Sequence, residues 1–239
     1  MREREERKAP RGLQLDRVVL LGRTFEEYRK YFLLEPEEWR GKKVLDVAGG
    51  VSSFCAEAND DGMIVKSVDP IYSKTPEEIA RQSGPDLDKV IAGVRGLPTY
   101  RWTAYRDPEH VRELRERAVK RFLEDFSLRP ERYRVGALPE LPFSDGEFDL
   151  TLVSYLLFAY EEHFSYEFHR DAVLELMRVT SINRGEARIY PTVTFEAEPS
   201  RHVARMMEDP ECARFRLEIV ETDFEFLVGS NRFLRITHR

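Results

Sequence analysis

The sequence has little cysteine and no long apolar run. Cys55 and Cys212 lie far apart and neither belongs to a C-x-x-C pair, so a structural zinc site or a disulfide framework is not expected. No apolar stretch approaches the roughly 20 residues that span a bilayer. The first eleven residues are a mixed-charge stretch without the apolar core of a signal peptide. We therefore expect a cytoplasmic protein with no membrane partner, no metal ion and a disordered tail over residues 1–12.

Basic residues are outnumbered, because 38 lysines and arginines face 44 aspartates and glutamates and the formal net charge is −6. A negative net charge argues against binding of nucleic acid over a large basic surface. It is compatible with a local basic patch, so a nucleic-acid partner stays open. Hydrophobic residues make up 41% of the 239, which is enough for a sizeable core. The length favours one large α/β domain, which we expect over residues 13–239.

The first half of the chain has the pattern of a βαβ unit. Residues 44–48 form a compact β-branched run that ends in Gly49-Gly50, as a buried parallel strand running into a tight turn would. A helix is predicted over residues 52–59, and residues 63–68 read as a second buried strand that ends at Asp69. Strand, glycine turn, helix, strand and acid in this order predict a right-handed crossover in a parallel sheet.

Strand and helix patterns alternate through most of the remaining chain. The other predicted elements are a leading helix over 24–34, a long amphipathic helix over 107–126, strands over 133–137, 148–154 and 186–190, helices over 155–164, 170–179 and 201–207, and a closing hairpin of 215–227 with 232–237. Residues 72–107 interrupt the pattern with breakers such as Gly84-Pro85. We expect this segment to be a helical, lid-like insertion that covers the site.

The glycine turn and the acid that ends the second strand are informative together. A nucleotide-like ligand laid across the carboxyl ends of parallel strands needs a turn without bulky side chains, and about 20 residues later an acceptor for the ribose hydroxyls. Gly49-Gly50 and Asp69 supply both features. Glycine also serves in many turns simply to reach positive φ, so the turn without the acid would be weak evidence.

Three stretches resemble the motifs of class I S-adenosylmethionine-dependent methyltransferases. They are residues 44–54, residues 138–158 and residues 175–190, in the order and at the spacing of that family. The set is similar to an uncharacterised bacterial and archaeal subgroup, whose leader looks like residues 23–28. The resemblance implies the family's Rossmann-like α/β fold: a seven-stranded, mostly parallel sheet with a closing antiparallel hairpin and helices on both faces. It also implies a methyltransferase enzyme whose cofactor is S-adenosyl-L-methionine.

The resemblance assigns cofactor-binding roles along the first two strands. Asp46 would orient the methionine ammonium, and Asp69 would accept both ribose hydroxyls. Ala48, Gly49 and Gly50 would let the turn lie against the methionine part. The family's usual Gly-x-Gly-x-Gly reads Ala-Gly-Gly-Val-Ser at this position, which narrows the turn without blocking it.

Further cofactor contacts are implied elsewhere. Ser154, at the end of the fourth strand, would offer its backbone carbonyl near the ammonium and face the transferred methyl group. Ala137 and Leu138 would border the adenine, although many relatives carry an acid at the position of Ala137. Arg23 or Tyr28 would bind the cofactor carboxylate, while a surface arginine and a packed tyrosine are the alternative interpretation.

A methyl group on a sulfonium is already activated, so the enzyme mainly has to align the acceptor and exclude water. For a hydroxyl acceptor a proton must leave, and His163, His169, Tyr155 and Glu161 cluster after the fourth strand. Histidine is favoured as a base by its pKa, with surface or packing roles open for both histidines.

The family's motif for methylating planar amino groups, Asn or Asp followed by Pro-Pro and an aromatic residue, is absent after Ser154. Amino groups of bases are therefore less favoured acceptors. We expect a small-molecule acceptor, with RNA and protein acceptors kept open. Two alternatives stay open. A nicotinamide-dependent oxidoreductase would use the same turn and acid, and a non-catalytic S-adenosylmethionine-binding protein would keep the cofactor site without the chemistry.

Overall fold

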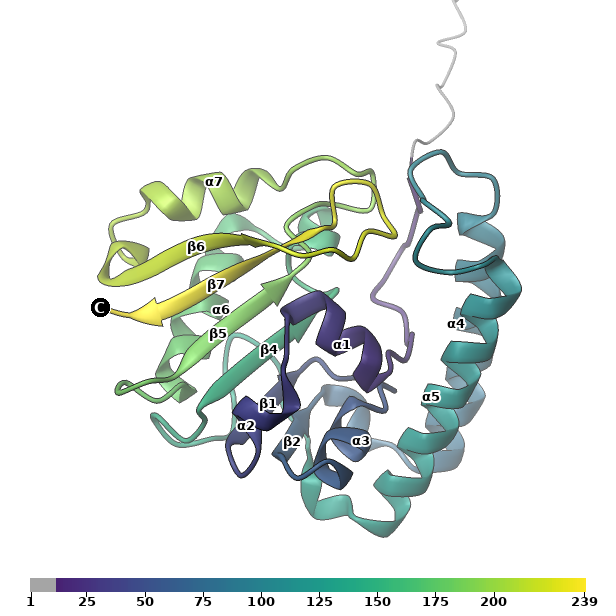
Figure 1. Ribbon diagram of the computed structural model, residues 1–239, viewed down its shortest axis with the longest axis horizontal. Coiled ribbons are helices and arrows are strands. Elements are labelled where there is room, and N and C mark those ends of the chain that lie inside the picture. The colour runs from purple at the N-terminus through teal and green to yellow at the C-terminus, as the bar shows by residue number, and fades with distance from the viewer. Residues whose placement is uncertain (1–11) are drawn as a thin grey trace, which may run out of the picture.

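The computed structural model describes residues 12–239 (Figure 1), so all but the last residue of the predicted tail lies outside the described residues. The strands are β1 (Lys43–Val47), β2 (Ile64–Val68), β3 (Tyr133–Arg134), β4 (Leu150–Ser154), β5 (Glu186–Tyr190), β6 (Phe215–Glu221) and β7 (Arg232–His238). The α-helices are α1 (Phe25–Phe32), α2 (Pro36–Trp39), α3 (Phe54–Asp60), α4 (Pro76–Val94), α5 (Pro108–Leu128), α6 (Tyr166–Val179) and α7 (Arg201–Glu208).

The seven strands form one sheet in the order β3-β2-β1-β4-β5-β7-β6. β1 to β5 pair in parallel, and β7 runs antiparallel to both β5 and β6. Every residue of β4 and β5 is buried, as expected for central strands covered on both faces. The predicted Rossmann-like fold, with a mostly parallel sheet and a closing antiparallel hairpin, is confirmed.

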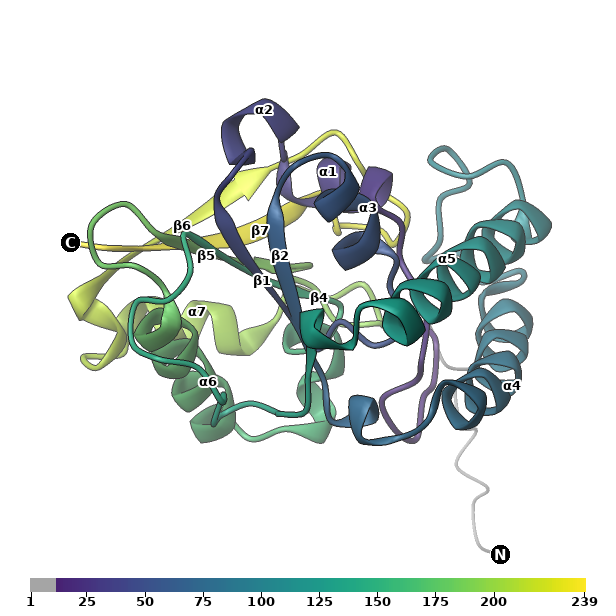
Figure 2. The same cartoon turned by 90° about the horizontal axis from the view of Figure 1, so that it is seen from below.

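Helices cover both faces of the sheet (Figure 2). α1 and α3 lie on one face, where Tyr28, Phe32 and Phe54 belong to the larger apolar core. α6 and α7 lie on the other face, where Leu176 and Met206 belong to a second core. Because both faces are covered, the sheet can carry a ligand site at its strand ends, which is where the turns and loops meet.

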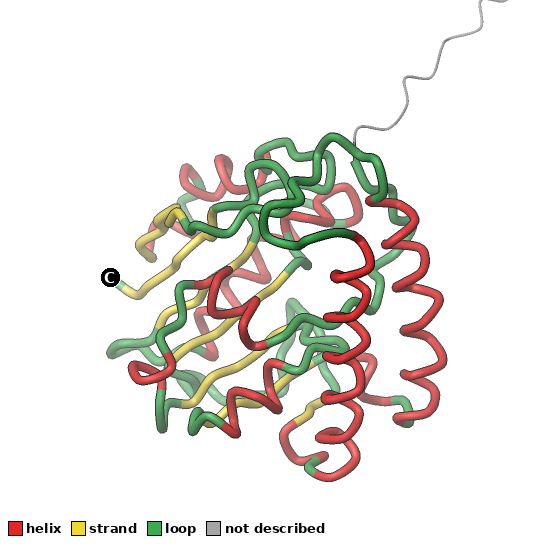
Figure 3. The backbone as a smooth tube through the Cα atoms, turned by 45° about the vertical axis from the view of Figure 1, so that its right-hand side comes forward, coloured by secondary structure: helices red, strands yellow, loops and turns green. Residues whose placement is uncertain are grey.

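The segment predicted as a helical insertion, residues 72–107, contains α4, which forms a helical hairpin with α5. α4 runs without interruption through Gly84 and Pro85, where we expected a break. Proline removes one helical hydrogen bond, but burial of a continuous apolar face that includes Ile79, Leu87 and Ile91 keeps this helix intact. α4 and α5 stand side by side at one edge of the molecule (Figure 3), joined by a loop over residues 95–107.

Two further predictions need correction. The helix predicted over 155–164 is a short 3-10 turn, Phe158–His163, because Tyr155 takes a left-handed conformation with φ of 54° that ends the strand in a sharp turn. α6 begins at Tyr166 rather than at residue 170, because Ser165 accepts a hydrogen bond from the amide of Phe168 and caps the helix earlier.

Some predicted strands are shorter in the structure. The third strand keeps two residues, Tyr133–Arg134, at the sheet edge. The first strand of the closing hairpin ends at Glu221, because the following loop pairs with the α4–α5 loop instead of continuing β6. Tyr100 and Leu227 form an antiparallel bridge there, and the amide of Arg101 donates to the carbonyl of Phe226 at 2.7 Å.

A buried ion pair joins the leading helix to the α4–α5 hairpin. Thr24 and Glu27 form a capping box at the start of α1. The Arg115 guanidinium on α5 donates to both carboxylate oxygens of Glu27, each at 2.6 Å, and the two side chains are only 3% and 5% exposed. The hydroxyls of Tyr31 and Tyr105 also donate to this carboxylate.

We expect Arg115→Met to lower the free energy of unfolding by about 3–5 kcal/mol, because it leaves the Glu27 carboxylate buried without its cation. Chemical denaturation at neutral pH measures the change. Arg112→Met is the matched control on the same helix: its ion pair with Asp88 is on the surface, so it should change stability by at most about 1 kcal/mol. Equal losses in the two variants would contradict the assignment of the buried pair.

Candidate functional site

A cavity of about 370 Å³ lies beyond the carboxyl ends of the parallel strands. Its wall includes the turn after β1, Asp69 after β2 and Ser154 at the end of β4, faced by apolar side chains of α4 and α5. An extended segment, residues 12–22, crosses between the strand ends and the helical hairpin (Figure 1); we call it the strap. The volume lies within the range of about 300–1,000 Å³ that is usual for small-molecule sites.

The turn after β1 has a shape that restricts side chains. Ala48 and Gly50 both have positive φ, 57° and 52°, so an alanine occupies a left-handed position that glycine would favour. A Cβ on Gly49 would come within 2.0 Å of the Ser67 hydroxyl and 2.4 Å of an Asp46 carboxylate oxygen. Glycine at position 49 therefore lets the turn lie directly on the side chains of β1 and β2.

Asp69 fixes this turn from the end of β2. One carboxylate oxygen accepts from the amide of Gly50 at 3.0 Å, and the other accepts from the amide of Ile71 at 2.9 Å. Burial raises the pKa of Asp69, while these two amides oppose the rise. Each carboxylate oxygen has a second lone pair, so this side chain can accept hydroxyl groups of a ligand in the cavity as well.

Asp46 lies behind the turn rather than in the cavity wall. It is 1% exposed, and it accepts hydrogen bonds from the Tyr28 hydroxyl at 2.9 Å and from the Ser67 hydroxyl at 3.2 Å. Burial raises the pKa of Asp46 to about 7, partly offset by these two donors. Tyr28 lines the cavity, so the predicted influence of Asp46 on a ligand passes through this tyrosine.

Arg23 and Ser154 contribute polar groups that lack partners. The Nε atom of Arg23 and the hydroxyl of Ser154 are buried and have no hydrogen-bond partner within residues 12–239, and both residues line the cavity. Arg23 donates from Nη1 to the carbonyl of Leu21 at 3.0 Å, and its guanidinium carbon lies 4.5 Å from the centre of the Tyr155 ring. Buried polar atoms are normally satisfied, so these atoms indicate a place for a polar ligand.

The structure does not bring all predicted cofactor residues to the cavity. Ala137 is exposed, and Leu138 is packed in the second core with residues such as Val68. Neither residue lines the cavity, so their role at the adenine stays a prediction.

The two histidines named as candidate bases also lie away from the cavity. His163 lines a separate hollow with Glu161 and Glu162. His169 is fully buried, and its ring nitrogens lie 2.8 Å and 3.1 Å from the carbonyl oxygens of Ser165 and Leu157. Both contacts hold the loop after β4 against α6, which is a positioning role. Tyr155, the third candidate, does line the cavity.

Several lining residues were missed by the sequence reasoning. The largest omission is the pair Tyr31 and Arg115, which line the cavity and contact the hydroxyl of Tyr105. A signal for Arg115 existed, because it lies four residues after Val111 on the apolar face of α5. An arginine at a buried helical position requires an acidic partner, but the sequence could not show that Glu27 supplies it.

The strap is tied down by polar contacts on both sides. Arg17 forms a two-pronged ion pair with Asp86 on α4, and the same carboxylate accepts from the amide of Leu20 at 2.8 Å. The amide of Val19 donates to the Tyr160 hydroxyl at 3.2 Å on the opposite side. These contacts keep the strap across the cavity mouth.

Within the described part of the chain, no group of three or more histidine, cysteine, aspartate or glutamate side chains is arranged to hold a metal ion. Across residues 12–239, no helix is both long and apolar enough to cross a membrane.

Gly49→Ala should lower the free energy of unfolding by about 1–3 kcal/mol, because the added methyl group overpacks the contact with Ser67 and Asp46. Thermal and urea unfolding give the values. Gly84→Ala is the control: its Cβ would meet nothing within 4 Å, and alanine in a helix interior should stabilise by about 0.5–1 kcal/mol. A Gly49→Ala variant as stable as the wild type would disprove the tight contact.

The raised pKa of Asp46 predicts a pH-dependent stability. The folded state keeps the proton up to about pH 7, whereas the ordinary pKa of an aspartate in an unfolded chain is 3.8. The folded chain therefore binds more protons between these values, and its stability should fall as the pH rises through them, by at most about 1.4 kcal/mol per pH unit.

Asp46→Asn should abolish this slope, since asparagine can still accept from Tyr28 and does not titrate. Urea unfolding between pH 4 and pH 8 tests the effect. Asp145→Asn, at an exposed aspartate, should keep the wild-type slope. Parallel curves for the wild type and Asp46→Asn would show that Asp46 is not the titrating group.

No family model matches the sequence. The chain is 36% identical to the uncharacterized protein MJ0045 of Methanocaldococcus jannaschii over 228 residues, which cover 95% of this chain and 99% of that protein. This identity, over nearly the whole of both chains, places them in one family.

Among solved structures, the chain is similar to a Rhodobacter sphaeroides protein provisionally described as a Zn-dependent alcohol dehydrogenase, with a TM-score of 0.53 and 13% identity over 92% of each chain. It also matches 1,6-didemethyltoxoflavin-N1-methyltransferase of Burkholderia thailandensis, solved with that substrate and S-adenosylhomocysteine, with a TM-score of 0.45 and 14% identity over 88% of this chain and 76% of the other. The first likeness establishes a shared fold and nothing about activity. The chain therefore belongs to the same family as the uncharacterized protein MJ0045, and it has a Rossmann-like α/β fold.

Proposed function

We propose that the chain binds S-adenosylmethionine in the cavity at the strand ends and transfers its methyl group to a small-molecule acceptor. One observation carries the proposal: the turn after β1, the acid after β2 and the end of β4 surround a single cavity that also holds buried polar atoms without partners. Those three strand ends are where this fold places a nucleoside ligand.

The residues present fit this cofactor. Asp69 has free lone pairs for the ribose hydroxyls, and the backbone of Ala48, Gly49 and Gly50 offers an open surface for the methionine part. The Tyr28 hydroxyl, which donates to Asp46, would present its oxygen to the ammonium group. The cofactor, when bound, supplies a methyl group activated by the adjacent sulfonium.

The remaining contacts concern the two ends of the cofactor. Ser154 would accept from the ammonium through its backbone carbonyl, close to the transferred methyl group. Of the two residues predicted for the cofactor carboxylate, Tyr28 donates its hydroxyl to Asp46, whereas Arg23 has donors free for either the cofactor carboxylate or an anionic acceptor. Ala137 and Leu138 would have to move toward the cavity to reach the adenine, so their role requires a shift of the loop after β3.

The chain itself contributes alignment and exclusion of water. The strap and the α4–α5 hairpin, which we propose acts as the lid, cover the cavity with apolar side chains, which favours transfer by holding donor and acceptor together. Tyr155 is a positioning residue here: burial raises the pKa of its phenol, so it stays protonated at neutral pH. No histidine lines the cavity within residues 12–239, and the transfer proceeds without one of the predicted histidine bases.

An oxidoreductase that uses a nicotinamide cofactor is the second candidate. The Rhodobacter sphaeroides protein described as an alcohol dehydrogenase shares only the fold; the observation in favour of this candidate is Asp69, which holds the glycine turn at the strand ends. The same turn and the same Asp69 would serve a nicotinamide dinucleotide. Within the described residues, however, the chain has no cluster for the zinc ion that the name of that protein implies.

Isothermal titration separates these candidates. We expect S-adenosylmethionine and S-adenosylhomocysteine to bind and NAD not to bind. Asp69→Ala should weaken cofactor binding by about 1–3 kcal/mol through lost hydrogen bonds, whereas Asp88→Ala, on the exposed face of α4, should bind like the wild type. Binding of NAD, with no binding of either sulfur compound, would refute the proposal. Incubation with radiolabelled methyl donor and cell extract then tests for catalysis. An enzyme would transfer the label to a small molecule, whereas a non-catalytic cofactor-binding protein would label none.

A further inference from the structure

The side of the cavity away from the glycine turn carries one more positive charge than negative charge. We call this part the acceptor side; it is lined by Arg23, Tyr31, Tyr100, Tyr105, Arg115, Tyr155 and Phe226, whose rings and guanidinium groups contact one another. Burial alone would raise the pKa of Glu27, but Arg115 and then Arg23 lower it to about 2, so Glu27 is ionised. One carboxylate and two guanidinium groups leave a net charge of +1.

The uncompensated charge belongs to Arg23. Glu27 is already bound by both terminal nitrogens of Arg115, and no carboxylate within residues 12–239 lies within ion-pair distance of Arg23. Arg23 is partly buried, its Nε lacks a partner, and its guanidinium lies over the ring of Tyr155. A buried charge without a partner is unfavourable, so this position calls for an anion supplied by a ligand.

The rest of the acceptor side limits what that anion can be attached to. Apolar side chains come from the strap, from both helices of the hairpin and from two loops: Leu13, Leu15, Leu21, Val90, Val94, Val111, Phe195 and Phe226. Of the other two cations in the wall, Arg115 is paired with Glu27, and Lys74 is exposed and bound to Gln82. A single unpaired cation in an apolar wall fits one anionic group on an apolar body, and it does not fit a polyanion such as a nucleic acid.

No group on this side is suited to remove a proton from the acceptor. Burial raises the pKa of Tyr31, Tyr100, Tyr105 and Tyr155, so all four are neutral phenols. The Glu27 carboxylate is held by Arg115. An acceptor that already carries a negative charge needs no base, because its own lone pair attacks the methyl group.

We infer that the acceptor is a small apolar monocarboxylate, that Arg23 binds its carboxylate against Tyr155, and that the carboxylate oxygen receives the methyl group. The inference rests on the proposed function. A carboxylate oxygen forms a bond to the methyl carbon while the carbon–sulfur bond breaks and its electron pair stays on sulfur. The products are a methyl ester and a neutral thioether, and no proton moves.

The apolar wall suits this reaction. An anion and a sulfonium combine into two neutral products, so charge disappears along the reaction. A water-excluding site without strong competing charges favours such a change over one that creates charge. Arg23 draws the anion into the cavity, and Tyr155, which follows Ser154 at the strand end, places it beside the transferred methyl group.

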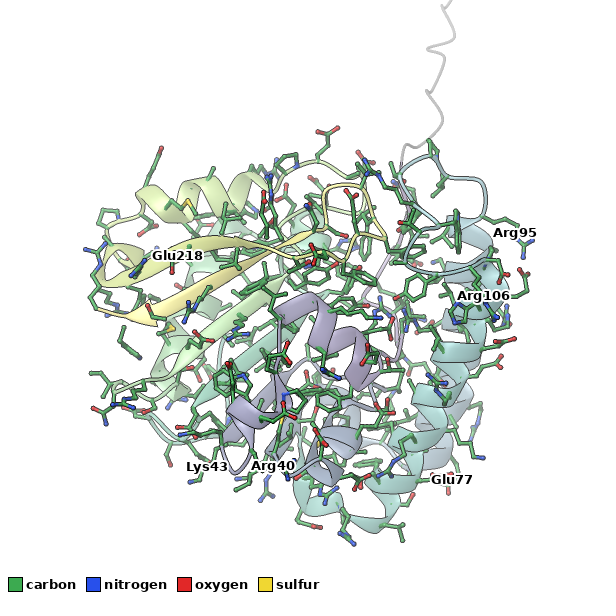
Figure 4. All side chains as sticks on the ribbon, in the orientation of Figure 1. Arg40, Lys43, Glu77, Arg95, Arg106 and Glu218 are labelled. Carbon is green, nitrogen blue, oxygen red and sulfur yellow. The ribbon has the colours of Figure 1, made fainter. Side chains whose placement is uncertain are left out.

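The first experiment asks which ligand Arg23 holds. Arg23→Gln is compared with the wild type and with Arg106→Gln, an exposed arginine on the outer side of the hairpin (Figure 4). All three are titrated with S-adenosylhomocysteine, and the loaded proteins are then titrated with benzoate and octanoate and with benzamide as a neutral probe. Unfolding curves establish that the variants are folded.

We expect Arg23→Gln to bind S-adenosylhomocysteine within about threefold of the wild type and to lose at least about 30-fold in carboxylate affinity, the usual effect of removing one partner of a buried charge pair. Benzamide should not distinguish the proteins. The inference is overturned if Arg23→Gln mainly loses S-adenosylhomocysteine, which would assign Arg23 to the cofactor carboxylate. It is also overturned if the loaded wild type binds no carboxylate.

The second experiment tests the chemistry. The wild type is incubated with S-adenosylmethionine and a panel of aromatic and aliphatic monocarboxylates, and methyl esters are measured by mass spectrometry. Ester formation that Arg23→Gln reduces at least about tenfold, and Arg106→Gln leaves intact, supports the inference. Methylation of neutral amines or phenols but of no carboxylate overturns it. Failure of the proposed function is a different result, because then no protein in the series binds S-adenosylhomocysteine.

Discussion

The buried pair of Glu27 and Arg115 determines how the cavity is built. Glu27 caps its own helix and also receives the guanidinium of α5, so one carboxylate fixes the start of α1 against the helical hairpin. The residues that precede it, Arg23 and the strap, are thereby carried across the strand ends. Without this pair, the hairpin would still pack on α3, but its main polar link to the leading helix would be the contact between the hydroxyls of Tyr105 and Tyr31. The pair thus converts two separate coverings of the sheet into one enclosed site.

The sequence predicted the part of the site that depends on the sheet. The carboxyl ends of parallel strands share one edge, so Gly49, Asp69 and Ser154 had to meet once the strands were recognised. The positions of residues that reach the site from helices could not be predicted in this way. Arg115 depends on the angle at which α5 crosses α1, and His169 looked like a neighbour of Tyr155 although the sharp turn at Tyr155 directs the two to opposite faces. The spacing of residues along the sequence specifies neither the angle at which two helices cross nor the direction of the turn at Tyr155.

The predicted break at Gly84-Pro85 is absent from the structure for a related reason. Gly84-Pro85 is a strong local signal for a break, yet α4 continues because its apolar face is buried against α5 and the strap. Tertiary burial outweighs a penalty of about 3 kcal/mol for one proline. The break predicted at Gly84-Pro85 was wrong, which is the usual limit when packing partners lie far away in the sequence.

The charges around the cavity divide into two groups, and their separation affects the order in which two ligands bind. Asp46 and Asp69 lie behind and beside the glycine turn, where their pKa values are raised by burial, so a cationic ligand on that side would favour their ionised forms. Arg23 lies on the other side, where a cation alone is unfavourable. The proposed cofactor also presents its sulfonium to the acceptor, and this positive charge adds to that of Arg23 in attracting an anion. Binding at the turn should therefore come first and prepare the acceptor side, because each bound charge improves the field for the next one.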